Sequence, residues 1–224
     1  NVFRGWSQSD VFLLDRGARA RGRVVAPDDA HALVTVTAGQ DHLYDGRVRA
    51  GRLLLLTNEG APRYQLLGID PARAVDPAAR TVVIPEGAGT IDGWEIAGSR
   101  LVLHVLSDVR SHLVVHGLDG ALEGEIELPG RGSVSSFDAE LESGRVLFDF
   151  SSYVHAPSVR LWTPPRRRAR RSGAGAATLG APTTVAEVDV PADLSALEVS
   201  QDSVASADGT PINVYWVHRR DLVR

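Results

Sequence analysis

Short apolar runs separated by polar turns recur along this chain in a fixed order. Each copy holds two apolar runs with a turn between them, and an arginine stands near the start of the first run. The three copies occupy residues 51–70, 99–119 and 144–162. Their arginines, Arg52, Arg100 and Arg145, are 48 and 45 positions apart. Runs of β-prone residues between Gly, Asp, Asn and Pro turns predict strands throughout, and no long stretch keeps a helical period.

Each copy is followed by a short apolar run that ends on a proline. These runs lie at residues 24–27, 82–85, 126–129 and 188–191, the first of them after a half copy at 10–15. Proline cannot donate to a β-ladder, so it suits the end of an outer strand. A further strand then leads into the next copy, as at 91–96 and 133–137.

Four short strands in each unit of about 40 to 50 residues are typical of propeller blades. The sequence therefore predicts an all-β fold with about three to four four-stranded blades before residue 195. Propellers close with about four to eight blades, so we expect a partial β-propeller. An ordinary β-sandwich with accidental spacing is the alternative.

The pattern changes after residue 194. Two strands, 197–203 and 211–218, flank a turn that contains Asp208-Gly209, and Asp-Gly is a strong hairpin signal. The hairpin does not fit the blade template. We therefore predict two domains, a partial propeller over 1–194 and the start of a second domain over 195–224.

Composition excludes several classes of function. The formal net charge of −4 argues against nucleic acid as a partner, and no apolar run approaches the roughly 18 residues of a membrane span. Cysteine is absent, which excludes disulfides and thiolate nucleophiles and agrees with a cytoplasmic location. The chain also has no Met, even at position 1, so we expect a piece of a longer protein.

Candidate chemistry outside the repeats is sparse. His112 and His116 fall on one face of a predicted strand, but no third ligand accompanies them, so neither a metal nor a cofactor is predicted. The acidic residues 138, 140 and 142 suit a solvated turn better than a calcium loop. The arginine tract 166–171 favours a solvated loop over a site for acidic partners. The four tryptophans are expected in core or inter-blade packing; they are Trp6, Trp94, Trp162 and Trp216.

Five segments, taken in order, resemble the prolyl oligopeptidase family of serine peptidases. They are TNEGAPRY at 57–64, LSDVRS at 106–111, LPGRGSV at 128–134, FSSY and the residues after it at 150–157, and the hairpin at 206–219. The family often has His where Ser107 stands. The resemblance runs from about residue 1 to about residue 222.

The resemblance implies a seven-bladed propeller that restricts access to an α/β-hydrolase domain, whose first strands would be the hairpin. It implies an endopeptidase that cleaves short peptides after proline, and Arg4 as a substrate contact from the propeller. The nucleophile of that chemistry lies in a G-x-S-x-G elbow, and the chain contains none. No catalytic residue is therefore predicted here, and we expect this chain to be inactive by itself.

Two other functions stay open. The chain could be a stand-alone propeller-like module that binds a protein partner, or an inactive peptidase remnant. The hairpin favours the peptidase, because a free-standing propeller has no use for the opening strands of a hydrolase. The predicted partners are then short proline-containing peptides and the protein's own hydrolase domain, with no nucleic acid and no membrane.

Overall fold

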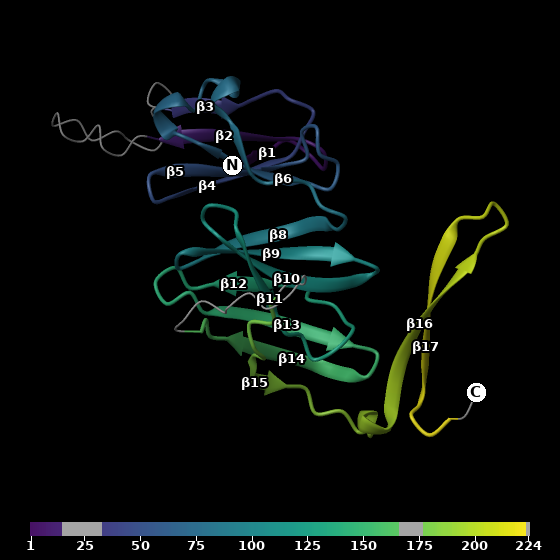
Figure 1. The fold of residues 1–224 in the computed structure, drawn as a ribbon. Helices are drawn as coiled ribbons and strands as arrows, with labels where there is room; N and C mark the ends of the chain where they lie inside the picture. The colour runs from purple at the N-terminus through teal and green to yellow at the C-terminus, as the bar shows by residue number, and fades with distance from the viewer. Residues whose placement is uncertain (15–32, 166–176, 223–224) are drawn as a thin grey trace. The chain divides into compact units, whose positions relative to one another are not determined.

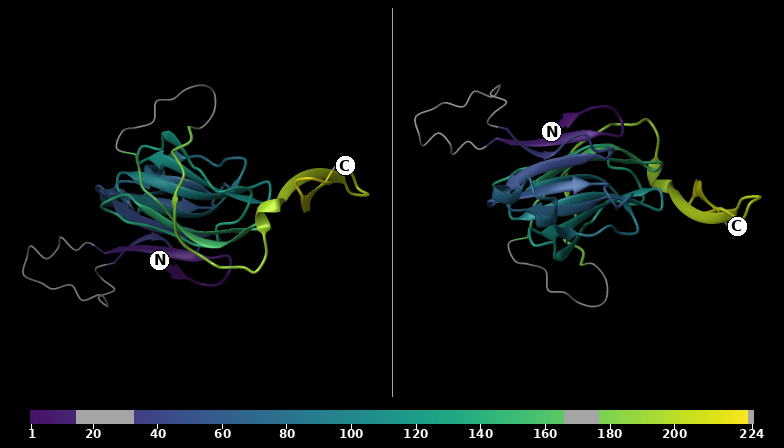
Figure 2. Two further views of the ribbon diagram at one scale, coloured as in Figure 1. Left: turned by 90° about the horizontal axis from the view of Figure 1, so that it is seen from below. Right: turned by 90° about the horizontal axis from the view of Figure 1, so that it is seen from above.

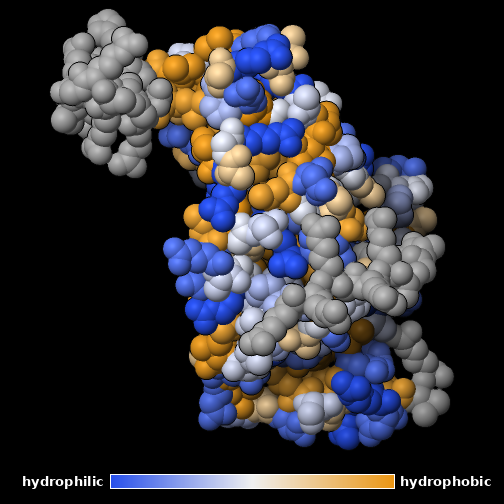
Figure 3. Space-filling view, turned by 60° about the vertical axis from the view of Figure 1, so that its left-hand side comes forward, coloured by the Kyte–Doolittle hydropathy of each residue, from blue (hydrophilic) through white to orange (hydrophobic). Residues whose placement is uncertain are grey.

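The computed structural model describes residues 1–14, 33–165 and 177–222 (Figure 1). These residues form antiparallel sheets and three short 3-10 turns, and they group into two compact units, Asn1–Thr90 and Ile91–Arg224. No helix in this described part of the chain is long and apolar enough to cross a bilayer. Hydrophobic and hydrophilic residues are interspersed on the face shown in Figure 3.

The first unit contains a three-stranded sheet and a four-stranded sheet. The smaller sheet has the order β1 (Val2–Phe3), β2 (Ser9–Leu14), β3 (Leu33–Thr37). The larger one is a meander of β4 (Tyr44–Arg49), β5 (Arg52–Thr57), β6 (Gln65–Ile69) and β7 (Thr81–Ile84). One core joins the two sheets; its buried members are Val11, Val36, Tyr44, Leu53, Leu55, Leu67, Ile69 and Ala74.

The second unit repeats the four-stranded meander twice. The first of its sheets holds β8 (Thr90–Ala97), β9 (Arg100–Ser107), β10 (Arg110–Gly117) and β11 (Leu122–Ile126). The next holds β12 (Phe137–Ala139), β13 (Val146–Ser152), β14 (His155–Trp162) and β15 (Thr183–Glu187). Their facing sides share a core of Ala97, Val102, Leu113, Val115, Ile126, Val134, Val146, Phe148, Phe150, Trp162 and Leu179.

The predicted fold class is confirmed, because the described residues form successive four-stranded antiparallel meanders, as the blades of a propeller do. Some outer strands were placed wrongly. The strand predicted at 126–129 is β11, which already ends at Ile126, and the one predicted at 188–191 is β15, which ends at Glu187. Proline marks the exit from the blade in both cases, but pairing ends a few residues before it. The run at 24–27 lies outside the described residues.

The strand predicted at 133–137 was also placed too early. Ser133 forms only an isolated bridge with Ser151, and the strand β12 begins at Phe137. The intervening Ser135 and Ser136 bond through their backbone N–H groups to the Asp149 carboxylate instead, at 2.8 and 2.7 Å. The Asp149 carboxylate therefore accepts the hydrogen bonds that a neighbouring strand's carbonyl groups would accept in a β-ladder.

The predicted hairpin is confirmed as β16 (Leu197–Ala205) and β17 (Pro211–Arg219), which pair along their whole length. The Ser206 N–H donates to the Thr210 carbonyl at 2.8 Å, and Gly209 adopts a φ of +83° that suits glycine. Figure 2 shows the hairpin extending beyond the sheets of its unit.

The tryptophan prediction was half wrong. Trp94 and Trp162 are buried, at 2% and 1% exposure, and the Trp162 indole donates to the Leu179 carbonyl at 3.2 Å. Trp6 is fully exposed and Trp216 is 51% exposed. Trp6 lies in a bend between strands and Trp216 lies on a two-stranded hairpin, so neither sits between two packed sheets.

Candidate functional site

Two buried side chains and one exposed carboxylate in the second unit stand in the order of a catalytic triad. The Ser111 Oγ lies 2.8 Å from the His104 Nε2, and the His104 Nδ1 lies 3.3 Å from the Asp92 Oδ2. They come from β10, β9 and β8, three neighbouring strands of one sheet. Geometry alone would allow the histidine to take a proton from the serine.

The surroundings of Ser111 exclude that chemistry. Its hydroxyl oxygen accepts a hydrogen bond from the Val134 N–H at 2.9 Å, while the Ser111 N–H donates to the Gly132 carbonyl at 3.0 Å. Ser111 and His104 are only 4% and 5% exposed, so a substrate carbonyl cannot reach the hydroxyl. The group ties the sheet β8–β11 to the segment before β12, and we call Asp92, His104 and Ser111 the inter-blade clasp.

The electrostatics of the clasp favour neutral histidine. Burial lowers the pKa of His104 below its ordinary value of 6.5, and the Asp92 and Asp149 carboxylates oppose this only in part. The neutral ring accepts at one nitrogen and donates at the other, which matches a serine hydroxyl on one side and a carboxylate on the other.

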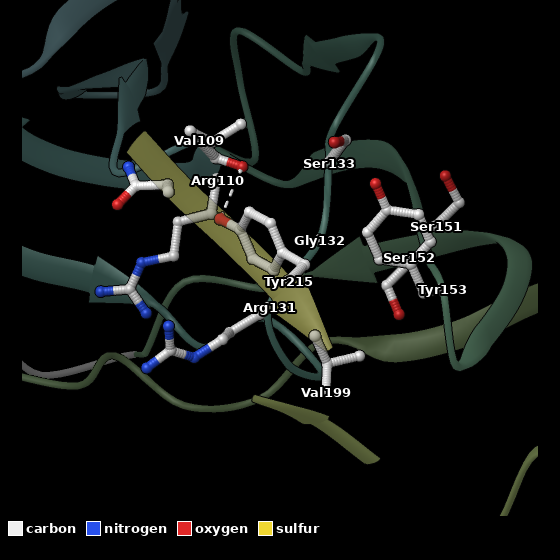
Figure 4. Close-up of a pocket in the computed structure, with 11 residues that line it drawn as sticks. Val109, Arg110, Arg131, Gly132, Ser133, Ser151, Ser152, Tyr153, Val199 and Tyr215 are labelled. Atoms are coloured by element: carbon white, nitrogen blue, oxygen red, sulfur yellow. Dashed lines mark hydrogen bonds between the residues drawn. The ribbon is translucent and has the colours of Figure 1, made fainter. Parts of the chain in front are cut away.

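A cavity of about 480 Å³ opens between the blade loops and the hairpin of the second unit (Figure 4). It is the candidate functional site. Its walls come from the β9–β10 turn, the segment before β12, the end of β13 and both hairpin strands. The lining residues are Val109, Arg110, Arg131, Gly132, Ser133, Ser151, Ser152, Tyr153, Val199, Asn213 and Tyr215.

The β9–β10 turn is held in place by Tyr215 of the hairpin. Asp108 and Val109 have φ of +50° and +58°, the signature of a two-residue turn whose twist matches the flanking strands. A β-branched residue is unfavourable in this conformation. The Tyr215 hydroxyl donates to the Asp108 carbonyl at 2.7 Å and reaches the Val109 carbonyl at 3.3 Å, so the hairpin stabilises the strained turn.

Further contacts set the width of the cavity. The Arg131 guanidinium donates to the Gln201 side-chain oxygen of β16. The rings of Tyr153 and Tyr215 lie 6.2 Å apart. Figure 4 shows Arg110 and Arg131 on one side of Tyr215, with Ser151, Ser152 and Tyr153 on the other. The cavity therefore has a cationic side and a hydroxyl-rich side.

The lining carries two arginines and no acidic residue. The Ser152 hydroxyl lies 2.8 Å from the His155 Nδ1, and burial, helped by Arg160, lowers the pKa of His155. A neutral imidazole accepts a hydrogen bond from this hydroxyl, and the uncharged serine does not offset the arginine charge. The cavity is suited to an anionic group.

Arg4, the predicted substrate contact, lies in the first unit and is not among the residues that line the cavity. Its guanidinium forms an ion pair with the Asp10 carboxylate, which is 1% exposed and also accepts from the Gly39 N–H at 2.9 Å. Burial opposes ionisation of Asp10, but the Gly39 N–H and Arg4 outweigh it and hold its pKa below the usual range. Arg4 therefore has a structural partner, and its side chain is 55% exposed.

The histidine pair does not converge on a ligand site. The His112 Nδ1 lies 3.3 Å from the Glu125 Oε2, and the His116 Nδ1 lies 2.9 Å from the Gly120 carbonyl. Within the described ranges, no group of three or more His, Asp or Glu side chains could hold a metal ion.

Of the other sequence candidates, one can be placed and one cannot. Glu140, in the acidic turn, accepts from Arg145 at 2.7 Å. The arginine tract 166–171 lies outside the described residues.

Residues 1–160 match the family model for the N-terminal β-propeller domain of prolyl oligopeptidase. The chain belongs to the prolyl oligopeptidase family. This is a family of serine peptidases, and the sequence-based prediction of the family is confirmed. Three of the segments that carried the resemblance, 106–111, 128–134 and 150–157, supply eight of the residues lining the cavity. The cavity was not predicted, because nothing in the sequence shows that these segments meet.

Solved structures of this family have the same fold. One, from a study of two prolyl endopeptidases and of inter-domain dynamics in their catalysis and specificity, is 26% identical, with a TM-score of 0.75 over 98% of this chain. Prolyl oligopeptidase B from Galerina marginata, bound to a 35mer hydrolysis and macrocyclization substrate, is 15% identical, with a TM-score of 0.67 over 84% of this chain. Oligopeptidase B from Leishmania major is 18% identical, with a TM-score of 0.62 over 88% of this chain.

The chain spans much less than these whole proteins. It covers 29% of the prolyl endopeptidase, 25% of the Galerina enzyme and 28% of the Leishmania enzyme. No curated protein sequence matches the chain. The comparisons therefore concern only a part of each of these relatives.

Proposed function

We propose that this chain is the propeller portion of a serine endopeptidase that cleaves short peptides after proline. The observation that carries the proposal is the 26% identical prolyl endopeptidase, whose fold matches 98% of this chain. In this proposal the blades cover the active site of a hydrolase domain in the same protein and admit only short peptides.

The hairpin β16–β17 supports the domain division at residue 195. It pairs with neither blade of its unit, and the match to the prolyl endopeptidase is long enough to include most of it. We propose that residues 195–224 begin the α/β-hydrolase domain. In a longer protein that contains this domain, its helices and sheet would cover the apolar hairpin residues that are exposed here, such as Trp216 and Ile212.

The chain by itself is expected to be inactive. It contains no G-x-S-x-G elbow, and Ser111, which stands in a triad-like group, is buried with its hydroxyl already bonded. The test compares the purified 224-residue chain with the longer protein on a fluorogenic peptide that has proline before the scissile bond. We expect turnover only by the longer protein, and much slower turnover when alanine replaces the proline.

Two results would overturn the proposal. Hydrolysis by the 224-residue chain that a serine-directed inhibitor abolishes would contradict its inactivity. Equal cleavage of the proline and alanine peptides by the longer protein would contradict the specificity. The proposal that the blades admit only short peptides is tested separately by substrate size. The longer protein should cleave peptides of about 10 residues but not a folded protein with an exposed loop that contains proline.

Arg4 remains a proposed substrate contact, supported by its half-exposed guanidinium. In the longer protein, Arg4→Gln should raise KM with little change in kcat. If Arg4→Gln lowers the melting temperature but leaves KM unchanged, Arg4 has only a structural role, through its ion pair with Asp10. We also propose a cytoplasmic location, which fractionation of the producing cells would test.

A further inference from the structure

The guanidinium of Arg110 is incompletely bonded. Its Nε is buried and has no hydrogen-bond partner among the described residues, and its side chain forms no ion pair with them. A buried N–H without an acceptor is unfavourable, and native structures rarely keep one without a reason. Arg110 is one of the residues that line the cavity.

Neither of the two guanidiniums that line the cavity forms an ion pair with a carboxylate of the described residues. Arg110 and Arg131 also border a second cavity of about 350 Å³, where Glu125 and Glu127 contribute to the lining. Glu125 faces His112 at 3.3 Å, and neither arginine forms an ion pair with a glutamate in the described part of the chain. Two guanidiniums are therefore available to an anion that enters from the larger cavity.

The rest of the larger cavity indicates what else the anion carries. Val109, Val199 and the rings of Tyr153 and Tyr215 supply apolar surface, while Ser133 and Ser151 supply hydroxyl groups. A volume of about 480 Å³ lies within the range of small-ligand sites, which is roughly 300 to 1,000 Å³. This mixture suits a chain of residues with an anionic end better than a bare inorganic ion.

We propose that this cavity binds the C-terminal carboxylate of a short peptide. Arg110 and Arg131 would hold the carboxylate oxygens through charge-assisted hydrogen bonds, and Tyr153 and Tyr215 would contact the last side chains of the peptide. The proposal extends the proposed peptidase function by naming a feature of the peptide. Binding needs no cleavage, so the two proposals can fail separately.

The test is isothermal titration calorimetry on the 224-residue chain. The probes are the tetrapeptide acetyl-Gly-Pro-Ala-Phe as the free acid, the same peptide as the C-terminal amide, and inorganic phosphate. We expect the acid to bind at least about tenfold more tightly than the amide, because a charged acceptor strengthens each hydrogen bond. Arg110→Gln should remove this preference.

Arg145→Gln is the matched control, because Arg145 pairs with the exposed Glu140 outside the cavity. It should bind the acid as the unmodified chain does. If circular dichroism shows that Arg110→Gln does not fold, Arg131→Gln replaces it, because Arg131 is the second arginine that lines the cavity. This variant should likewise lose the preference for the acid over the amide.

Three outcomes would overturn the inference. The acid and amide could bind equally, or neither could bind at millimolar peptide. Phosphate could bind as tightly as the acid, which would leave an anion site without peptide recognition. Failure of the longer protein to cleave proline peptides, with the acid still bound here, would refute only the proposed function.

Discussion

Ser111 shows how the same pair of side chains can serve catalysis or architecture. A hydroxyl near a histidine is a nucleophile when it is exposed and its oxygen is free. Here the oxygen accepts from the Val134 N–H and the residue is buried, so the pair holds two blades together. The difference lies in the neighbours of the serine and not in the serine–histidine distance of 2.8 Å.

The inter-blade clasp should make stability depend on pH. The pKa of His104 is lowered in the folded state, so the unfolded state binds protons more readily below about pH 6.5. The contribution of His104 is therefore present above pH 6.5 and is lost as the pH falls below it. In urea unfolding at pH 7.5 and 5.5, His104→Gln should lose less stability on acidification than the unmodified chain.

Some pH dependence of stability should remain in His104→Gln, because burial also lowers the pKa values of His116 and His155. Ser111→Ala is the matched variant within the clasp. It leaves the Val134 N–H without its acceptor and should cost about 1–3 kcal/mol at both pH values. An unchanged pH dependence in His104→Gln would contradict the role given to this histidine.

At the scale of elements, β11 depends on one glycine. Gly124 has a φ of +155°, and a methyl group in its place would lie 2.0 Å from the Ala177 carbonyl oxygen. The segment at Ala177–Leu179 bonds to β11 through Glu125, whose N–H donates to Ala177 at 2.9 Å and whose carbonyl accepts from Leu179 at 2.8 Å. Only glycine lets this segment approach the strand so closely.

Gly124→Ala should therefore destabilise the second unit by about 1–3 kcal/mol, the range for forced overpacking. Chemical unfolding followed by Trp fluorescence measures this, since the buried Trp162 bonds to Leu179 in the same segment. Gly87→Ala, in the first unit, is the control for the added methyl group itself, because no heavy atom beyond its chain neighbours lies within 4 Å of that group. Equal stability of the two variants would show that the segment can move away at little cost.

At the scale of the whole molecule, each compact unit has a core of its own. Leu55 belongs to the core of Asn1–Thr90 and Leu113 to that of Ile91–Arg224, and both are fully buried. A chain in which each of two units holds its own core need not unfold in a single step. We expect two thermal transitions by differential scanning calorimetry.

The matched pair Leu55→Ala and Leu113→Ala assigns these transitions. Each substitution leaves a cavity and should destabilise its own unit by about 2–5 kcal/mol. Each should lower one transition and leave the other in place. A single transition that both variants shift alike would mean that the chain unfolds as one cooperative body.

The sequence by itself determined the blades, the hairpin and the family. Strand order depends on local alternation and turn chemistry, so the repeats around Arg52, Arg100 and Arg145 predicted the central strands β5, β9 and β13. The hairpin followed from Asp208-Gly209, where a positive φ is needed. The ends of the outer strands were less predictable, because they depend on where pairing with the neighbouring strand stops. The pairing of β15 with β14, for example, ends at Glu187, four residues before Pro191.

Tertiary structure alone decided which side chains meet. Whether Trp162 is buried and Trp216 exposed depends on the layers around each strand, and no local pattern records them. The inter-blade clasp joins side chains of three consecutive strands, and the cavity joins residues from segments far apart in the chain, such as Arg110, Arg131 and Tyr215. Long-range contacts of this kind are fixed only when the blades pack, which is why the sequence predicted the propeller but not its candidate site.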